Sequence, residues 1–386
     1  MATPNEYRSA KRMATVLALH GFRMAELGAV LLKRLCLWVP NPQWFRPIDL
    51  EFISTRPRLE HGGDDGGEEQ KVKLTSFNLR DRPARLTYRF PWREWKNPLA
   101  NAQFAQRALS LGNNFIVAQT YELLALARRN PAGTYSHDSE PFFSTSHKQP
   151  DGATFSNLLE PDVVDVAAIT MEEWAAIIHE ARSIMIANGG IVEAATSADE
   201  LDKRLVAICH GSKTFATLSS LRKKDRLASG EDNDLKGAFD CYLDHEVVSA
   251  AQQEWVELYY TGSGAAALEI RISGTGGTPA GGQAAGLQVI ASEGRPFVFT
   301  FTDRPKQITI PIEDIDRDEF RMRIQRHMEL TTGYPQVALQ IRPVQVAGLA
   351  GRLGRVSASA QAAAPKKEPK KAAKQEAAKQ EAPKGE

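Results

Sequence analysis

The segment "NPLANAQFAQRALSLGNNFIVAQTYELLALARRN" (97–130) carries the strongest structural signal in the chain. Its apolar residues recur at helical spacing and keep to one broad face over about nine turns. They are Leu99, Ala102, Phe104, Ala108, Leu111, Phe115, Ala118, Leu123 and Leu126. Asn97-Pro98 is a suitable helix start, and two arginines precede the stop at Asn130-Pro131. We therefore predict one long helix, with Gly112 as the place where it could break.

Upstream of this segment, residues 12–37 are predicted to form an amphipathic helix, because large apolar residues recur at steps of three and four. These residues are Leu17, Met24, Leu27, Val30, Leu31 and Leu35. The prolines of "VPNPQWFRP" (39–47) stop the helix. Such a helix can pack on its own domain or lie as an arm over a neighbouring subunit, and the pattern does not choose between the two.

Residues between this helix and the long one have the pattern of strands. "DLEFIST" (49–55) precedes the acidic, glycine-rich tip "EHGGDDGGEEQ" (60–70), and "KVKLTSF" (71–77) and "ARLTYRF" (84–90) follow it in near alternation. We predict a long two-stranded excursion. Because an isolated hairpin of this length is barely stable in water, we expect it to lean on another part of the chain or on another chain.

The C-terminal half mixes helix and strand signals. "TMEEWAAIIHEARSIMIAN" (170–188) is predicted as a helix capped by Thr170, and "SADELDKRLVAI" (197–208) as a helix or a helix-to-strand transition. Short β-type runs follow, and Arg321 to Leu330 with Gln336 to Val344 are predicted to close the fold as a strand pair. The β-type runs are "EWVELYY", "AALEIRI", "LQVIAS", "FVFTFT" and "QITIPI". The class is α+β.

Composition excludes several classes of protein. The chain has 386 residues and a net charge of +1, so its overall charge gives no argument for nucleic acid. Its three cysteines, Cys36, Cys209 and Cys241, lie far apart without paired spacing, which argues against a disulfide scaffold and fits a reducing cytosol. We expect a soluble protein, because charged residues interrupt the most hydrophobic region, 16–39, before about 20 uncharged residues accumulate.

The stretch "SHDSEPFFSTSH" (136–147) holds side chains that could build a hydrolase or a metal site. It lacks the G-x-S-x-G elbow of α/β-hydrolases, and His137 and His147 lack the spacing of a helical zinc site. The glycine loop at 274–286 lacks the lysine of a phosphate loop, and the acidic cluster at 312–319 lacks the spacing of a calcium loop. We predict a structural loop here, and no catalytic residue, metal site or cofactor elsewhere.

Several segments, in their order along the chain, resemble the Mu-like major head subunit family of tailed phages. A long helix ending in "ELLALARR" is followed by "YSHDSEPFFSTSH" and "GATFSNL", and the closing segment carries "RPFVFTF" and "TTGYP". The matching positions are Tyr135, Asp138, Phe142, Phe143, His147, Asn157, Leu158, Arg295, Pro296, Phe320, Gly333 and Tyr334. The resemblance covers roughly 97–343. A tryptophan that often follows the tyrosine in this family is replaced by Pro335-Gln336.

The resemblance implies the tailed-phage major capsid fold of the Hong Kong 97 type. In that fold an N-terminal arm (1–45) and an extended hairpin loop (46–96) precede a peripheral domain (97–165) that contains the spine helix (97–130). An axial domain (166–318) and return strands of the peripheral domain (319–346) follow, and residues 347–386 form a disordered tail rich in Lys, Ala and Glu. Its last part, 357–386, is too poor in large apolar residues to fold.

The resemblance also implies a function as a structural capsid subunit with no enzymatic activity. Copies would assemble as hexamers and pentamers into the icosahedral virion head around double-stranded DNA, in the host cytoplasm and away from membranes. The candidate subunit-contact residues are Arg80, Arg82, Arg85, Arg89 and Arg93, which otherwise form a solvated face. With about 45 residues before the hairpin, we expect a separate scaffold protein, together with a portal and decoration proteins.

Two other functions remain open at this point. A nucleic-acid-binding protein could act through the basic tail, 357–386, whose affinity would fall steeply with salt. A hydrolase could use His137, His147 and a nearby serine.

Overall fold

A computed structural model describes the parts of the chain that form its helices and strands. The described ranges are 4–41, 48–53, 74–79, 81–91, 101–130, 138–148, 153–163, 165–189, 204–227, 229–244, 255–262, 268–272, 287–291, 294–302, 306–310 and 319–345. They form an α+β fold with two hydrophobic cores. The predicted class is therefore confirmed. The glycine loop at 274–286, His137 and the tail at 347–386 lie outside these ranges, as does most of the acidic cluster at 312–319.

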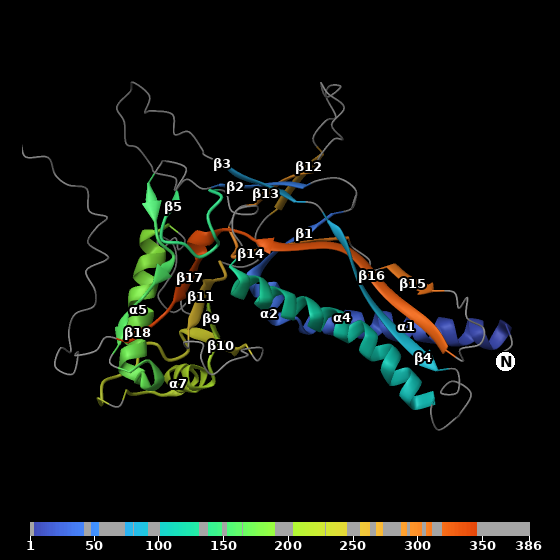
Figure 1. Cartoon of the computed structure of the whole chain (residues 1–386), viewed down its shortest axis with the longest axis horizontal. Coiled ribbons are helices and arrows are strands. Elements are labelled where there is room, and N and C mark those ends of the chain that lie inside the picture. Colours follow the sequence, from blue (N-terminus) through green and yellow to red (C-terminus); the bar gives the residue numbers. More distant parts are fainter. Residues whose placement is uncertain are drawn as a thin grey trace, which may run out of the picture.

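The long helix forms as predicted. α4 (Asn101–Arg129) is continuous through Gly112, and α1 (Pro4–Gly28) packs along it (Figure 1). Gly21 of α1 lies against Leu109, and Gly112 lies against Ala18, so the two helices run antiparallel. The predicted start at Asn97-Pro98 is outside the described residues.

The first helix differs from the prediction in its length and in its buried face. It begins at Pro4, is interrupted at Ala29, and continues as α2 (Val30–Leu35) into β1 (Cys36–Pro40). Its buried positions are mostly small: Ala10, Ala14, Ala18 and Phe22. Of the predicted face, Leu31 and Leu35 are buried, whereas Met24, Leu27 and Val30 are exposed. Small residues are favoured at the contact between α1 and α4 because they let the two helix backbones approach closely.

The first sheet joins strands from three distant parts of the chain in the order β1-β14-β16-β15, with β4 also paired to β16. Its members beside β1 are β4 (Arg82–Pro91), β14 (Phe297–Phe301), β15 (Lys306–Ile310) and β16 (Glu319–Thr332). Figure 1 shows β4, β15 and β16 beside α1 and α4 in one elongated arm of the molecule. Alternate side chains of β16 point into the first core, including Met322 and Ile324.

The second sheet lies between the two cores and has the order β10-β9-β11-β17-β7. Its strands are β7 (Leu158–Leu159), β9 (Leu205–Cys209), β10 (Phe239–Leu243), β11 (Val256–Tyr260) and β17 (Ala338–Ile341). In β9, Val206 and Ile208 belong to the first core, and Leu205, Ala207 and Cys209 to the second. The helices α5 (Met171–Ala187) and α7 (Ser212–Lys223) pack on the second-core face.

The predicted helix at 170–188 is confirmed as α5. Thr170 accepts a hydrogen bond from the backbone N–H of Glu173, and the Glu173 carboxylate accepts one from the N–H of Thr170. This reciprocal pair satisfies two N–H groups that a helix start otherwise leaves unpaired. Gly189, with φ of 82°, follows the helix end, where only glycine adopts such a conformation without strain.

A third sheet has the order β12-β13-β2-β3 and contains the predicted hairpin. Its strands are β2 (Ile48–Ile53), β3 (Leu74–Leu79), β12 (Leu268–Ile272) and β13 (Leu287–Ala291). β2 and β3 pair antiparallel as expected, and β13 lies parallel to β2 on its other side. The return strand predicted at 84–90 does not continue this hairpin, because β4 pairs with β16 instead.

The prediction that Arg321 to Leu330 and Gln336 to Val344 pair with each other is wrong. β16 and β17 lie in different sheets, because Gly333 to Val337 turn the chain, with η3 (Pro335–Val337) at the end of the turn. The predicted domain ranges 166–318 and 319–346 stay predictions, and the sheets combine strands from both. β12 to β15 pair with strands outside the second sheet, and β17 lies within it. The short elements are β5 (His147–Lys148), β6 (Thr154–Phe155), β8 (Asp162–Val163), η1 (Val166–Ala168) and β18 (Val344–Gln345).

Candidate functional site: the loop after α4, a buried charge cluster and an apolar helix surface

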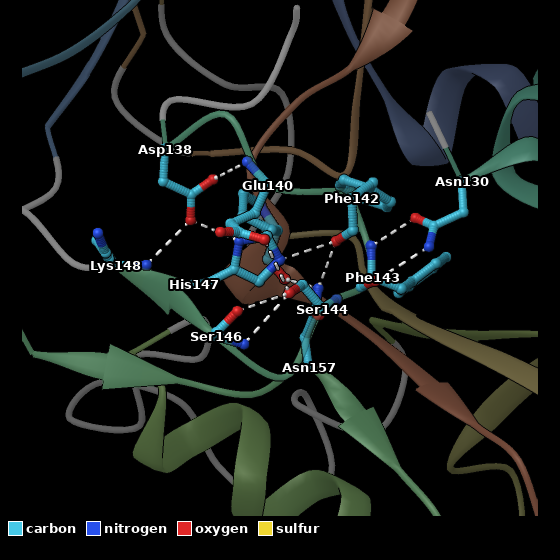
Figure 2. Close-up of polar contacts among 11 residues, drawn as sticks. Asn130, Asp138, Glu140, Phe142, Phe143, Ser144, Ser146, His147, Lys148 and Asn157 are labelled. Atoms are coloured by element: carbon cyan, nitrogen blue, oxygen red, sulfur yellow. Dashed lines mark hydrogen bonds and ion pairs between the residues drawn. The ribbon is translucent and has the colours of Figure 1, made fainter. Parts of the chain in front are cut away.

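The loop that holds Asp138 and His147 is an internally bonded structural unit (Figure 2). The Asp138 carboxylate accepts hydrogen bonds from the backbone N–H of Glu140 at 3.1 Å and of Lys148 at 3.0 Å. The same group lies 2.7 Å from Nδ1 of His147, and Nε2 of that ring lies 3.1 Å from the carbonyl oxygen of Phe142. Both ring nitrogens therefore face oxygen atoms of the loop itself.

Two asparagines fasten this loop to the rest of the fold. Asn130, at the end of α4, accepts from the N–H of Phe143 at 2.7 Å and donates to its carbonyl at 3.0 Å. Asn157 donates to the carbonyls of Phe142 and Pro335 and accepts from the N–H of Ser144. Phe142 and Phe143 are buried in the first core, as predicted. The loop thereby connects α4 with the turn before β17.

This geometry does not form a nucleophile–base pair. The ring nitrogens of His147 are engaged by Asp138 and by a backbone carbonyl, which leaves neither one to take a proton from a serine. The hydroxyl of Ser144 lies 3.3 Å from that of Ser146 and 3.5 Å from the Glu140 carboxylate. His147 therefore cannot act as the general base that the hydrolase alternative requires. The other histidine of that alternative, His137, lies outside the described residues.

Within the described ranges, no group of three or more His, Cys, Asp or Glu side chains is arranged to hold a metal ion. Among the described helices, none combines the length and the apolar character that crossing a bilayer requires.

A buried charge cluster lies on the first-core side of the second sheet. His210, just after β9, has both ring nitrogens at ion-pair distance from carboxylates, Asp244 at 3.3 Å and Glu257 at 3.2 Å. All three side chains are fully buried. Glu257 also accepts a hydrogen bond from the hydroxyl of Tyr259 at 2.7 Å, and Asp244 pairs with Arg128 near the end of α4. Two cations and two anions therefore balance one another inside the protein.

Burial by itself lowers the pKa of His210, but the two carboxylates outweigh it and raise the pKa to about 9. The ring also stacks on Trp255, with centroids 4.7 Å apart. His210 is therefore a charged, structural residue at neutral pH. The sequence pattern did not predict this cluster. The available signal was a set of polar residues at the ends of, or inside, strongly apolar strands such as "LVAICH" and "WVELYY".

A second ion-pair group joins β10 to the N-terminal helices. Asp240 pairs with Arg34 of α2 and, through its other oxygen, with Arg222 of α7 at 2.6 Å. Asp240 and Asp244 point to the same face of β10, and both reach arginines on helices of the first core. β10 is therefore the strand through which charged contacts connect the second sheet to α2 and α4.

The helical layer exposes several large apolar side chains among its polar and charged ones. Large hydrophobic side chains with 38–70% exposure, among the described residues, all lie on α1, α2 and α4. They are Val16, Met24, Leu27, Val30, Leu109, Val117 and Tyr121, and we call this set the apolar helix surface. A gathering of exposed apolar residues on one layer is typical of a protein–protein contact surface.

The predicted contact arginines lie beside this layer where the structure describes them. Arg82, Arg85 and Arg89 are exposed on β4, while Arg80 and Arg93 lie outside the described residues. Arg82 lies 3.7 Å from Glu329 of β16 and is 74% exposed, so that intrachain pair is weak.

Comparisons with known proteins are limited to structural likeness. No family model matches the sequence, and no curated protein matches it. The chain is similar to a chain in the capsid of Cyanophage P-SCSP1u, with 9% identity, a TM-score of 0.43, and coverage of 82% of this chain and 88% of that one. It is similar to a chain in the capsid of an empty GTA particle, at 8% identity and a TM-score of 0.44, covering 82% and 90%. A chain in the satellite phage P4 procapsid shows 11% identity and a TM-score of 0.42, covering 85% and 91%.

Proposed function

We propose that this chain is the major capsid protein of a tailed phage. Its copies assemble as hexamers and pentamers into the icosahedral head shell that encloses double-stranded DNA. The role is structural and not enzymatic, and the protein is a component of the virion that assembles in the host cytoplasm. Further partners are a separate scaffold protein, a portal and decoration proteins. The ordered resemblance of its sequence segments to the Mu-like head subunit family supports this proposal.

The apolar helix surface is the observation that carries the proposal. A second surface that removes side chains such as Val16 (66% exposed) and Leu27 (70% exposed) from water lowers the free energy of the system, which favours association. α1 and α4, which present most of these side chains, are held together by close glycine and alanine contacts. A closely packed pair of helices that exposes apolar side chains suits a subunit that contacts copies of itself.

The β4 arginines supply weaker, directional contacts in this proposal. They pair with acidic residues of a neighbouring copy, each pair contributing about 0–1 kcal/mol. α4 contains one acidic residue, Glu122, so most of those partners lie outside the neighbour's long helix. Weak pairs that are repeated many times leave each contact reversible, which permits correction while a shell grows.

The experiment is to express the full chain, alone and with a co-expressed scaffold protein, and to measure particle size by sedimentation and negative-stain microscopy. Rings, sheets or shells are expected. The double variant V16E/L27E should stay small in the same assays, because each new carboxylate would be buried in the contact. The matched control is K213E, a charge change at an exposed residue of α7, which should assemble as the unmodified chain does. A monomer at every concentration and in both settings would contradict the proposal.

A further inference from the structure

Cys209 and Cys241 are distant in sequence but adjacent in space. Their sulfur atoms lie 3.3 Å apart, although 32 positions separate them. Cys209 ends β9 and Cys241 lies in β10, and these strands pair in parallel with Cys241 opposite Ala207 and Leu243 opposite Cys209. The two side chains are thus diagonal neighbours on one face of the sheet, the face toward the second core. All three cysteines are free thiols in the structure, as expected of a chain without a disulfide scaffold, but the linear spacing does not reveal that these two sulfurs are adjacent.

The two thiols differ in their access to solvent. Cys209 is completely buried, whereas Cys241 is partly exposed. Among the described strands β10 lies at the edge of its sheet, and the partly exposed Cys241 is the thiol of the pair that a small reagent reaches first. A reagent that reacts at Cys241 then finds the second sulfur already in contact.

We propose that Cys209 and Cys241 form a reversible intrachain disulfide and are a redox modification site of this protein. A disulfide needs a sulfur–sulfur distance of about 2.05 Å, so the atoms, now 3.3 Å apart, must approach by about 1.3 Å. Because the Cα atoms of diagonal neighbours lie about 7–8 Å apart, this approach requires a small shift of the edge strand β10 toward β9 together with side-chain rotation. This inference rests on the geometry alone and does not depend on the proposed function.

The oxidant is a small-molecule disulfide such as oxidised glutathione. The Cys241 thiolate attacks one sulfur of the reagent, the reagent's disulfide bond breaks, and one reagent thiol leaves. Cys209 then loses its proton and attacks the Cys241 sulfur, which forms the protein disulfide and releases the second reagent thiol. The protein gives up two electrons and two protons, and the reagent is reduced to two thiols.

The bond would act at the junction between the two cores. The opposite face of β10 carries Asp240 and Asp244, which pair with Arg34 of α2 and Arg128 of α4. A covalent bond from β10 to β9 restrains this edge strand and removes freedom from the unfolded chain. Oxidation is therefore expected to raise the thermal midpoint by about 5 °C or more.

The test uses the folded full chain incubated with oxidised glutathione, followed by intact mass, peptide mapping and thermal unfolding. We expect a mass loss of two hydrogens, a peptide pair linked through Cys209 and Cys241, a raised thermal midpoint, and reversal by dithiothreitol. The control C36S should behave in the same way, because Cys36 is a separate buried residue whose thiol pKa is raised by burial.

Single-cysteine variants test which thiol reacts with the reagent and which one closes the disulfide. C209S should stop at a stable mixed disulfide between glutathione and Cys241, because the second thiol is missing. C241S should resist modification, because the remaining sulfur of the pair is buried. Alanine replacements serve where a serine variant fails to fold. The proposal is overturned if no linked peptide forms while the chain stays folded, or if the linkage joins different chains.

Discussion

At the scale of single residues, two buried histidines show how this fold uses polar groups. His147 has its two ring nitrogens against Asp138 and a backbone carbonyl, and His210 lies between Asp244 and Glu257. His147 holds together one local loop, whereas His210 joins segments that are distant in the chain, and neither has a geometry suited to catalysis. The stretch around His147 contains residue types found in active sites, but its polar side chains form hydrogen bonds that hold the loop in place.

The first prediction concerns His210. H210A should lower the free energy of unfolding by about 3–5 kcal/mol, because it leaves two buried carboxylates without their shared cation. Chemical denaturation at pH 7 measures the change. The matched control is H179A, which removes an exposed pair in which His179 and Asp234 are 42% and 70% exposed, and which should change stability by about 0–1 kcal/mol. Equal effects for the two variants would show that the cluster is unimportant.

The second prediction concerns pH. The folded-state pKa of His210, about 9, exceeds the ordinary histidine value of 6.5, so the folded chain binds the proton more tightly than the unfolded chain does. Its stabilisation is complete below pH 6.5 and is lost as the pH rises through about 9, by about 3 kcal/mol in total. Denaturation curves for the unmodified chain and H210Q, collected between pH 6 and pH 9.5, should converge as the pH rises. Parallel curves would contradict this origin of the pH dependence.

At the scale of elements, the contact between α1 and α4 is decided by small residues. A Cβ atom on Gly112 would lie 1.9 Å from the carbonyl oxygen of Ala18 and 2.4 Å from the amide nitrogen of Phe22. Because both are backbone atoms, the helices themselves would have to separate. A pattern of large apolar residues cannot reveal such a contact, and for that reason the predicted face of the first helix is partly wrong.

The third prediction follows from this contact. G112A should destabilise the fold by about 1–3 kcal/mol, despite the better helix propensity of alanine, because it forces the two backbones apart. Thermal or urea unfolding measures the effect. Gly28 gives the control, since a Cβ there meets nothing within 4 Å, and G28A should be neutral or slightly stabilising. A neutral G112A would show that the helices can separate without cost.

At the scale of the whole molecule, the basic tail offers the alternative function. If residues 357–386 bind nucleic acid, affinity for duplex DNA should fall steeply as salt rises and disappear when they are deleted. The capsid proposal expects the deletion variant to fold and to form particles of the same size. Gel-shift assays at several salt concentrations, with electron microscopy of the same samples, distinguish the two. Loss of DNA binding together with unchanged assembly would assign the two roles to separate parts of the chain.

Sequence periodicity by itself determined the elements that depend on local physics. α4 follows from helical spacing and its stop signal, and α5 from helical spacing and a capping box formed within four residues. The β-type runs of the C-terminal half also form strands where they were expected. These features depend on residues that are close in sequence, so the spacing of apolar and capping residues is enough to predict them.

Tertiary structure alone decided which elements are partners. Alternation along β4 and β17 shows that they are strands but does not show that β4 leaves the hairpin for β16, or that β17 enters the second sheet. The charge cluster around His210 and the adjacent sulfurs of Cys209 and Cys241 arise in the same way, because strand pairing brings together residues far apart along the chain. Which strands become neighbours depends on how their side chains pack against the rest of the fold, and the spacing of residues along one strand does not contain that information.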